Sequence, residues 1–301
     1  MKKLYRITGT AVAALTLAAS AAAFSASQAT AQPTPAHRAA AVRAIAPPAP
    51  HPMIPAALPA GATGGAGNAA LGLSSMKTVG STNWGGYAVN KSGSKFRSIK
   101  ATFFVPFLNC AVSPGGANGT YSSDWVGLDG FTSSTVEQDG IEADCDGSNA
   151  QYFAWREVFP RDEQPSSIKI HPGDSVTASV RYSTSSHKYR MRVTDNTDGQ
   201  SFTVHQKCAG SACQRNSAEV ISEAPTIVIG STDTQASLAD YGAVNFTGIS
   251  ITNGSGRTGG IKSSHWTRTK IEQLGFNTHA VIAHPTALHG TSFGNYWLGE
   301  N

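Results

Sequence analysis

Residues 175–182 read Ser-Val-Thr-Ala-Ser-Val-Arg-Tyr, and residues 189–194 read Tyr-Arg-Met-Arg-Val-Thr. In both runs polar and apolar side chains alternate with a period of two, and β-branched residues are frequent. This alternation is typical of a β-strand with one buried face. Turn residues bound the runs, with Pro172-Gly173-Asp174 before the first and Asp198-Gly199 after the second. Both runs are therefore predicted to be strands.

The same strand signals recur on either side, at residues 100–106 and 244–251, and no helical window of useful length follows about Ser81. The composition agrees, because only 14% of the 301 residues are charged and long helices usually carry Lys- and Glu-rich solvent faces. Strands at this spacing predict an all-β domain, built as a sandwich or a barrel.

The first 31 residues have the three parts of a signal peptide: a basic start, an apolar run from about Ala11 to Phe24, and a small-residue cleavage site near Ala31. The alternative is a membrane anchor, but the run is short and Ala-rich for a span. Residues 32–78 are rich in Ala and Pro and contain no acidic residue, which predicts a propeptide or a linker. The folded domain is predicted at residues 79–301, and the chain is expected to be secreted and extracellular.

Charge is distributed unevenly along the chain. Residues 1–78 hold six basic and no acidic residues, so residues 79–301 hold 17 basic and 19 acidic ones, a net charge of −2. The predicted domain has no overall basic character, which argues against a nucleic-acid partner. If residues 32–78 are a propeptide, their positive charge would lie over an acidic cleft.

Four cysteines occur, at Cys110, Cys145, Cys208 and Cys213. In an exported chain an even number predicts two disulfides, although four cysteines allow three pairings. Cys208 and Cys213 enclose a short loop and form the natural local pair, which leaves Cys110 with Cys145. A zinc site is the alternative, but CxxC spacing is missing and an exported chain meets an oxidising compartment. No metal is predicted.

Familiar hydrolase motifs are absent or misplaced. The chain has no HExxH and no Asp-Thr-Gly or Asp-Ser-Gly, which excludes zincins and the usual aspartic-protease pair. Residues 290–294 match GxSxG, but a nucleophile elbow needs a following helix and later triad partners, and only seven residues follow. His279, His284 and His289 recur every five residues, a spacing that fits neither one helix face nor one strand face. They are predicted to be surface or loop residues, with a metal role as the weaker alternative.

Three stretches remain, at residues 125–142, 152–160 and 216–225. As strands, the second places Trp155, Glu157 and Phe159 on one face, and the third places Glu219 and Glu223 on one face. Two carboxylates four residues apart on a strand are about 13 Å apart. They cannot form a coupled pair, so a partner of Glu223 must come from another strand.

These stretches, taken in order, resemble the glutamic peptidases, also called eqolisins. The resemblance covers Ser81 to about Ile251 and more loosely the end. It rests on Asn-Trp-Gly-Gly at residues 83–86, Ala-Thr-Phe-Phe-Val-Pro at 101–106, Trp-Val-Gly-Leu-Asp-Gly at 125–130, Gln-x-Gly at 138–140, Trp-x-Glu-x-x-Pro at 155–160 and Ala-Glu-x-x-x-Glu at 218–223. Each motif alone is weak, but six in order are specific. The order of signal peptide, prosegment and domain is that of a bacterial-type secreted precursor.

The resemblance implies a two-sheet antiparallel β-sandwich of jelly-roll or concanavalin-like form, with a catalytic pair on its concave face. The family's glutamine falls on Gln138 and its glutamate on Glu223. Other candidate residues of the cleft, lining or supporting it, are Trp84, Trp125, Asp129, Glu142, Trp155 and Glu157. The chain departs from the family at Val220, where an aromatic residue is frequent. It also departs at Phe153 and Arg156, in a stretch where acidic or aromatic residues are common, so its subsite preference is expected to differ.

The implied activity is a secreted, acid-acting endopeptidase that is monomeric, needs no cofactor and takes protein or peptide substrates. Glu223 would act as general base on a water, and Gln138 would stabilise the oxyanion. The alternative from another class is a β-sandwich glycoside hydrolase or carbohydrate-binding module, with Glu157 and Glu223 as the paired acids. Gln138 discriminates between the two, because only the peptidase requires it.

Overall fold

The computed structural model describes residues 44–45, 76–112, 119–209, 213–229 and 232–300. The chain divides into two units, Met1–His37 and Arg38–Asn301, and all described residues belong to the second. The predicted signal peptide and most of the predicted propeptide lie outside the described residues, so the predicted domain boundaries stay predictions. No helix of the described part is long and apolar enough to cross a membrane.

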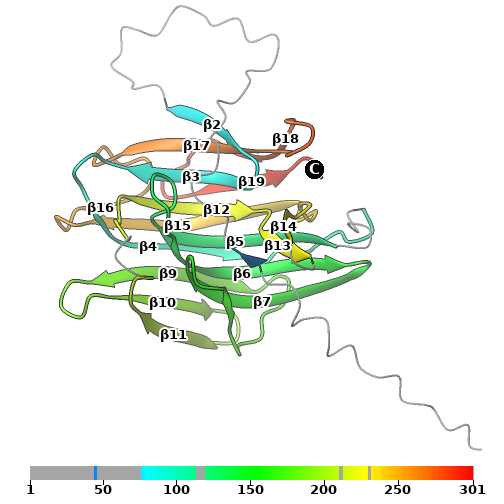
Figure 1. Ribbon diagram of the computed structural model, residues 1–301, viewed down its shortest axis with the longest axis horizontal. Helices are drawn as coiled ribbons and strands as arrows, with labels where there is room; N and C mark the ends of the chain where they lie inside the picture. Colours follow the sequence, from blue (N-terminus) through cyan, green and yellow to red (C-terminus); the bar gives the residue numbers. More distant parts are fainter. Residues whose placement is uncertain (1–43, 46–75, 113–118, 210–212, 230–231, 301) are drawn as a thin grey trace, which may run out of the picture. The chain divides into compact units, whose positions relative to one another are not determined.

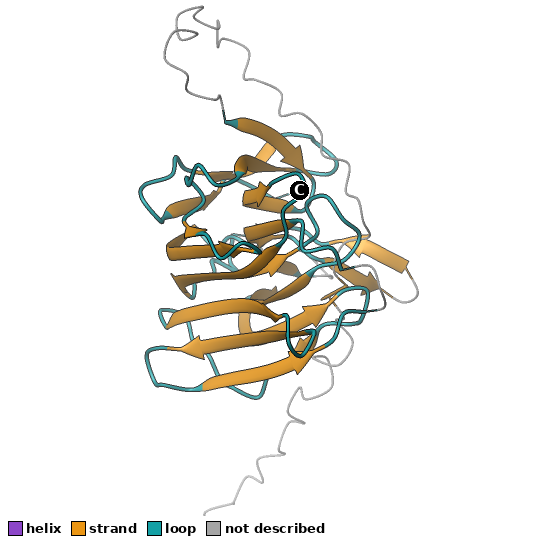
Figure 2. Cartoon of the chain, turned by 90° about the vertical axis from the view of Figure 1, so that its left-hand side faces the viewer, coloured by secondary structure: helices purple, strands orange, loops and turns teal. Residues whose placement is uncertain are grey.

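Regular structure in the described residues is entirely β, as Figure 2 shows. The strands are β1 (Ala44–Ile45), β2 (Lys77–Ser81), β3 (Trp84–Asn90), β4 (Phe96–Phe104), β5 (Thr120–Leu128), β6 (Glu137–Asp146), β7 (Asn149–Val158), β8 (Gln164–Pro165), β9 (Ser175–Ser183), β10 (Lys188–Asp195), β11 (Ser201–Gln206), β12 (Ser217–Glu223), β13 (Thr226–Ile229), β14 (Thr232–Gln235), β15 (Ala243–Asn253), β16 (Thr258–Gly259), β17 (Thr267–Leu274), β18 (Val281–Pro285) and β19 (Phe293–Trp297). The all-β prediction is confirmed. The strand expected at residues 100–106 begins earlier, at Phe96, and stops before Pro106, which has no N–H to donate to a ladder.

One hydrogen-bonded path runs β11-β10-β9-β4-β15-β19-β18-β17-β3-β12-β5-β6-β7-β8 (Figure 1). It folds over at β15, whose residues 243–246 pair with β19 while residues 247–253 pair with β4. Gly248 has a φ of 58° at this change of partner, a backbone conformation that glycine adopts without strain. We call β19 to β8 sheet I, and β11 to β4 with the second half of β15 sheet II. Strands β1, β13 and β14 form a separate small sheet.

The two sheets pack face to face. Strands β5, β6 and β12 of sheet I contact β4, β9 and β10 of sheet II without being hydrogen-bonded to them. Burial alternates along β10, as its sequence predicts, whereas β5 and β12 are buried at every position. Sheet I is therefore covered on both faces, and the architecture is a two-sheet sandwich rather than a barrel.

Each of the two covered faces of sheet I holds an apolar cluster. The larger lies between the sheets and the smaller lies on the outer face of sheet I. The larger contains Val126, Leu128, Ile141 and Val220 from sheet I with Ile99, Phe103, Val180 and Met191 from sheet II. The smaller contains Trp84, Trp125, Trp155, Val136 and Ile221. Each buried aliphatic or aromatic side chain contributes about 1.5–3 kcal/mol, and the smaller cluster lies where the candidate site residues are.

The four cysteines form two disulfides, Cys110–Cys145 and Cys208–Cys213. The pairing predicted from the short loop is confirmed. Because all four sulfurs are bonded in pairs, they do not offer thiolate ligands to zinc.

Candidate active site

The outer face of sheet I is assembled from five neighbouring strands, β3, β12, β5, β6 and β7, whose pairing is unbroken in register. Directly opposed residues of neighbouring strands point to the same side of a sheet. Three rows result: Ala88, Glu219, Gly127, Gln138 and Glu157; Gly86, Ile221, Trp125, Gly140 and Trp155; and Trp84, Glu223, Ser123, Glu142 and Phe153. Gln138 and Glu223 therefore lie on one face, two strands and four residues apart.

Glu223 ends β12 and is 3% exposed. Its Oε1 accepts a hydrogen bond from Nδ2 of Asn83 at 2.9 Å, and its Oε2 accepts one from Nε1 of Trp125 at 2.8 Å. Burial raises the pKa of Glu223 to about 7, although the bonds from Asn83, Trp125 and Trp84 oppose the shift. A carboxyl that titrates near neutrality can both accept and return a proton.

Gln138 lies on β6 and is 2% exposed. Its Nε2 donates to Oε2 of Glu157 at 2.6 Å, and its Oε1 is buried without a hydrogen-bond partner in the described part of the chain. A primary amide has two N–H donors, and the bond to Glu157 uses one of them. Glu157 thus orients the amide and leaves one donor for a group on the face.

The indole of Trp125 fills the space between the rows of Glu223 and Gln138. Its Nε1 bonds to Glu223, while its six-membered ring extends over Gly127, where an added methyl group would lie 2.8 Å from Cζ3. A methyl group at Gly140 would lie 2.7 Å from Cβ of Trp125. Gly127 makes room for the ring, whereas Gly140 allows the backbone at Asp124 and Trp125 to approach closely. Trp84 packs edge-on against the ring of Trp125 with centroids 5.1 Å apart.

Further carboxyl groups surround the pair, and burial is the main cause of each raised pKa. The pKa of Glu142 lies well above its usual value, because burial is reinforced by the charges of Asp144 and Glu163. The pKa of Glu163 is raised in the same way, first by burial and then by the charges of Glu157, Asp144 and Glu223. Burial also raises the pKa of Glu219. The face is acidic in composition, and burial favours the neutral form of these carboxyls.

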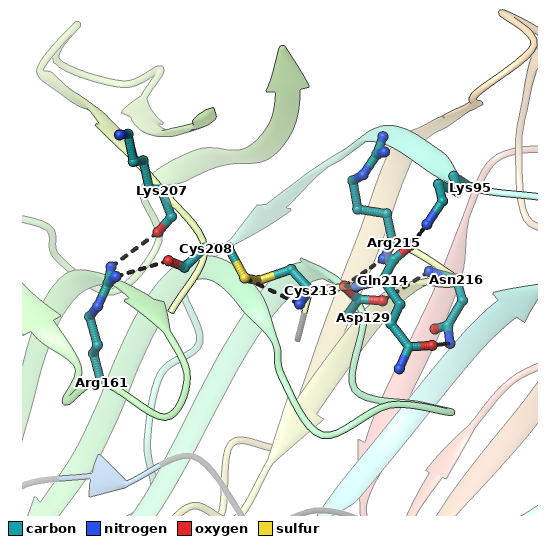
Figure 3. Close-up of a disulfide and its surroundings, with 9 residues drawn as sticks. All are labelled: Lys95, Asp129, Arg161, Lys207, Cys208, Cys213, Gln214, Arg215 and Asn216. Atoms are coloured by element: carbon teal, nitrogen blue, oxygen red, sulfur yellow. Dashed lines mark hydrogen bonds between the residues drawn. A yellow bond between two sulfur atoms is a disulfide. The ribbon is translucent and has the colours of Figure 1, made fainter. Parts of the chain in front are cut away.

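Asp129 makes its hydrogen bonds to the backbone of the segment before β12. It follows β5 with a φ of 72°, and its carboxylate accepts the backbone N–H groups of Gln214, Arg215 and Asn216 at 2.6–2.9 Å. Figure 3 shows these bonds beside the Cys208–Cys213 disulfide. Asp129 fastens the segment that leads into β12, so it supports Glu223 through the backbone.

The other motifs are not brought to this face. Ser292 of the GxSxG match lies in a tight turn, where its Oγ donates to the backbone oxygen of His289 at 2.7 Å. His279 lies in a turn with a φ of 53°, and His284 contacts Lys270 and Glu272. In the part of the chain that the structure describes, the three histidines do not form a metal-binding group.

Sequence reasoning missed Asn83 as a partner of Glu223, and it also missed Glu163 and Asp144 beside Glu142. Asn83 stands in the Asn-Trp-Gly-Gly motif, so the motif drew attention to the segment without revealing its contact. Only the antiparallel pairing of Trp84 with Glu223 brings residues 140 positions apart into reach.

Comparison with known proteins places these features in context. The family model described as the Peptidase A4 family matches residues 82–289. Aspergillopepsin-2 of Aspergillus niger is 29% identical over 213 residues, which cover 65% of this chain and 72% of the relative. Scytalidopepsin B of Scytalidium lignicola is 32% identical over 178 residues, which cover 57% of this chain and 64% of the relative.

Solved structures agree with the sequence comparison. The crystal structure of scytalido-glutamic peptidase with a transition state analog inhibitor superposes with a TM-score of 0.60 at 27% identity, over 72% of this chain and 98% of that one. The crystal structure of aspergilloglutamic peptidase from Aspergillus niger gives a TM-score of 0.50 at 26% identity, over 60% of this chain and 99% of that one.

Proposed function

The chain belongs to the Peptidase A4 family and is a glutamic-type endopeptidase. We propose that Glu223 and Gln138 are its catalytic pair and hydrolyse a peptide bond of a substrate bound between their side chains. The observation that supports this assignment most is that both side chains lie on one face of sheet I. There Glu223 accepts a hydrogen bond from Trp125, and Glu157 orients the amide of Gln138. On a flat sheet their Cα atoms would be about 16 Å apart. In the proposed complex the substrate peptide therefore lies over Trp125, between the two side chains.

The proposed reaction begins with a water held between the two side chains. The Glu223 carboxylate takes one proton from this water, and the resulting hydroxide attacks the carbonyl carbon. The carbonyl oxygen becomes an oxyanion that accepts the free N–H of Gln138, an interaction worth about 3–4 kcal/mol in comparable sites. Protonated Glu223 then gives its proton to the nitrogen as the C–N bond breaks, which releases an amine and a carboxylic acid and restores the carboxylate.

Acid action follows from the surroundings of Glu223. The raised pKa of Glu223 has burial as its largest cause, so hydration of the carboxyl by water entering the face would lower this pKa toward its ordinary value and let a fraction ionise in acid. Glutamine suits the oxyanion role because its amide donates hydrogen bonds without titrating there. The catalytic residues need no cofactor for these steps.

The glycosidase alternative is less well supported by the geometry. Glu157 lies one strand farther from Glu223 than Gln138 does, and its Oε2 accepts the Gln138 amide. Retaining glycosidases place their two carboxyls about 5–5.5 Å apart, which this register does not favour.

We further propose that the enzyme is a monomer exported as a bacterial-type precursor, with residues 1–31 as signal peptide and residues 32–78 as propeptide, and that nucleic acids are not partners. Two disulfides support an extracellular enzyme. Intact mass and N-terminal sequence after acid treatment test the processing. A mature chain that begins before residue 32 would contradict the signal peptide, and one that keeps residues 32–78 would contradict the propeptide.

Denatured casein at pH 3–4, with and without pepstatin, tests the catalytic assignment. Hydrolysis is expected to survive pepstatin and to vanish in Gln138→Ala, while Gln206→Ala, at the end of β11 on sheet II, serves as the matched control and keeps full activity. Far-UV circular dichroism checks that both variants fold. Retention of casein hydrolysis by folded Gln138→Ala, or cleavage of polysaccharide alone, would overturn the assignment.

A further inference from the structure

The outer face of sheet II has a composition unlike the rest of the molecule. Its outward positions on β4, β9, β10 and β11 carry Ser, Thr, Lys, Arg or His, apart from Phe104 at the end of β4, and none is acidic. The only acidic residue on these four strands, Asp195, is fully buried. The basic members of this face are Arg97, Lys100, Arg181, Lys188, Arg190, Arg192 and His205.

Strand register places three of these basic residues in a single row. Arg190 of β10 lies opposite Arg181 of β9 on one side and opposite His205 of β11 on the other. Arg97 precedes Ser98, which pairs with Arg181 from β4. Neighbouring strands are about 4.8 Å apart, so basic side chains stand side by side across the sheet. Like charges that are directly opposed destabilise a sheet.

Among the described residues, no ion pair joins a carboxylate to this row. The ion pairs of the described residues join His171 with Asp174, and Lys270 and His284 with Glu272. All of them lie outside the row. The repulsion would be relieved by an anion taken from solution.

The row opens onto a cavity of about 380 Å³. Its lining consists of Arg97, Arg181, Arg190 and His205, together with residues 182–186 of the β9–β10 turn. The turn contributes hydroxyl groups, since Oγ of Ser183 lies 3.0 Å from Oγ of Ser185 and accepts the N–H of Ser186 at 3.3 Å. The cavity thus combines three guanidinium groups and an imidazole with a hydroxyl-lined wall on one side.

We propose that this cavity, here called the arginine cavity, is a binding site for the phosphate group of a soluble phosphate ester. A guanidinium group presents parallel N–H donors that match two phosphate oxygens, and three arginines line this cavity. An imidazole N–H and serine hydroxyls supply further donors. The volume of about 380 Å³ is large enough for a phosphate group with a small organic body.

The arginine cavity is separate from the peptidase site. Arg181 and Arg190 point away from the cluster between the sheets, whereas Gln138 and Glu223 are on the outer face of sheet I. Two sheets and the core between them separate the two faces. A ligand in the cavity is therefore expected to leave casein hydrolysis unchanged.

The test is calorimetric titration of the full chain with glucose 6-phosphate and with inorganic phosphate, at low ionic strength and with glucose as the uncharged control. Saturable binding of both phosphates and none of glucose is expected. Arg190→Gln should weaken binding at least tenfold. Arg192→Gln is the matched control, since it removes the same charge from the same face of the same strand but lies outside the cavity lining, and it should change affinity less than twofold.

Further variants, fold controls and a titration with phosphatidic acid vesicles distinguish a soluble phosphate ester from a lipid headgroup and detect misfolding. Arg181→Lys keeps the charge and loses the planar fork, so it should weaken binding less than Arg181→Gln does. Circular dichroism and casein hydrolysis check the fold of each variant. The proposal is overturned if wild-type protein shows no saturable binding, if Arg192→Gln weakens binding as much as Arg190→Gln, or if only phosphatidic acid vesicles bind, which would mean a lipid surface instead.

Discussion

The outer face of sheet I buries its carboxyl groups, whereas the outer face of sheet II leaves its guanidinium groups in contact with solvent. Glu223 is 3% exposed and Glu219 is fully buried, while Arg181 and His205 are exposed. Burial alternates along β10 of sheet II but is complete along β5 and β12 of sheet I, so the two faces differ in how far their outward side chains are covered. Burial penalises the charged form, and it makes sheet I the face where groups titrate far from their ordinary pKa.

This contrast has a chemical consequence. On sheet I a carboxyl such as Glu223 has a raised pKa and fixed hydrogen-bond partners, which suits proton transfer. On sheet II the charges remain hydrated and permanent, which suits attraction of an oppositely charged ligand. Under the two proposals, the same sandwich would carry out hydrolysis on one face and bind an anion on the other.

The largest effect is expected from Glu223→Gln, which keeps the shape of the side chain and removes its ability to take a proton. We expect kcat to fall by at least about 10³, or about 4 kcal/mol, with peptide binding retained. Glu219→Gln is the matched control, being a buried glutamate on the same strand and face, and should stay within about tenfold of wild type. Casein hydrolysis at pH 4 measures both, and equal losses in the two variants would show that burial on this face, rather than Glu223 itself, matters.

The second effect is a loss of stability as pH rises. The pKa values of Asp124 and Glu223 are raised to about 7 in the folded chain, with burial as the largest cause, so the folded state binds more protons than the unfolded state above about pH 4. Their stabilising contribution is complete below pH 4 and is lost as pH rises toward 7, at about 3–4 kcal/mol for each group.

Urea unfolding at pH 3, 4.5, 6 and 7.5 measures this loss. Asp124→Asn removes one of the titrations, so the decline with pH should be shallower than in wild type. Arg190→Gln on sheet II should leave the slope unchanged. A stability maximum at neutral pH would contradict the assignment of raised pKa values to sheet I.

Much of this fold follows from local sequence. Alternation at residues 175–194 predicts β9 and β10, and the short spacing of Cys208 and Cys213 predicts their disulfide. The passage of β15 from sheet I to sheet II is not local, because it depends on which strands it meets on each side of Gly248.

The candidate site was predictable in its residues but not in its contacts. Motif order indicated Gln138 and Glu223, whereas the Asn83 bond to Glu223 needs the register of β3 with β12. The charge row on sheet II was hidden for the same reason. Arg181, Arg190 and His205 are unremarkable singly, and become neighbours only when three strands pair.

A third, intermediate loss of activity is expected on substitution of Trp125, whose Nε1 bonds to Glu223, the proposed general base. Trp125→Phe removes the Nε1 donor to Glu223, so the pKa of Glu223 should rise further and the rate at pH 4 should fall about tenfold, or about 1.4 kcal/mol. Trp155→Phe is the control, because Trp155 lies in the same row and its Nε1 has no hydrogen-bond partner among the described residues. The pH dependence of kcat/KM should shift in the first variant alone. A shift in both would mean that ring size, rather than the bond, sets the pKa.

The smallest effect is expected on sheet II, where a substitution should raise the stability of the protein instead of lowering a function. Arg190→Gln removes a charge that lies directly between Arg181 and His205, so at low ionic strength it should stabilise the protein, by about 0.2–0.5 kcal/mol. In 1 M NaCl the Debye length falls to about 3 Å, and this gain should disappear. The buried carboxyls of sheet I are screened far less by salt, so the pH-dependent loss described above should persist in 1 M NaCl. Urea unfolding at 20 mM and 1 M NaCl measures both, and a gain that survives high salt would show that Arg190 acts through packing instead of charge.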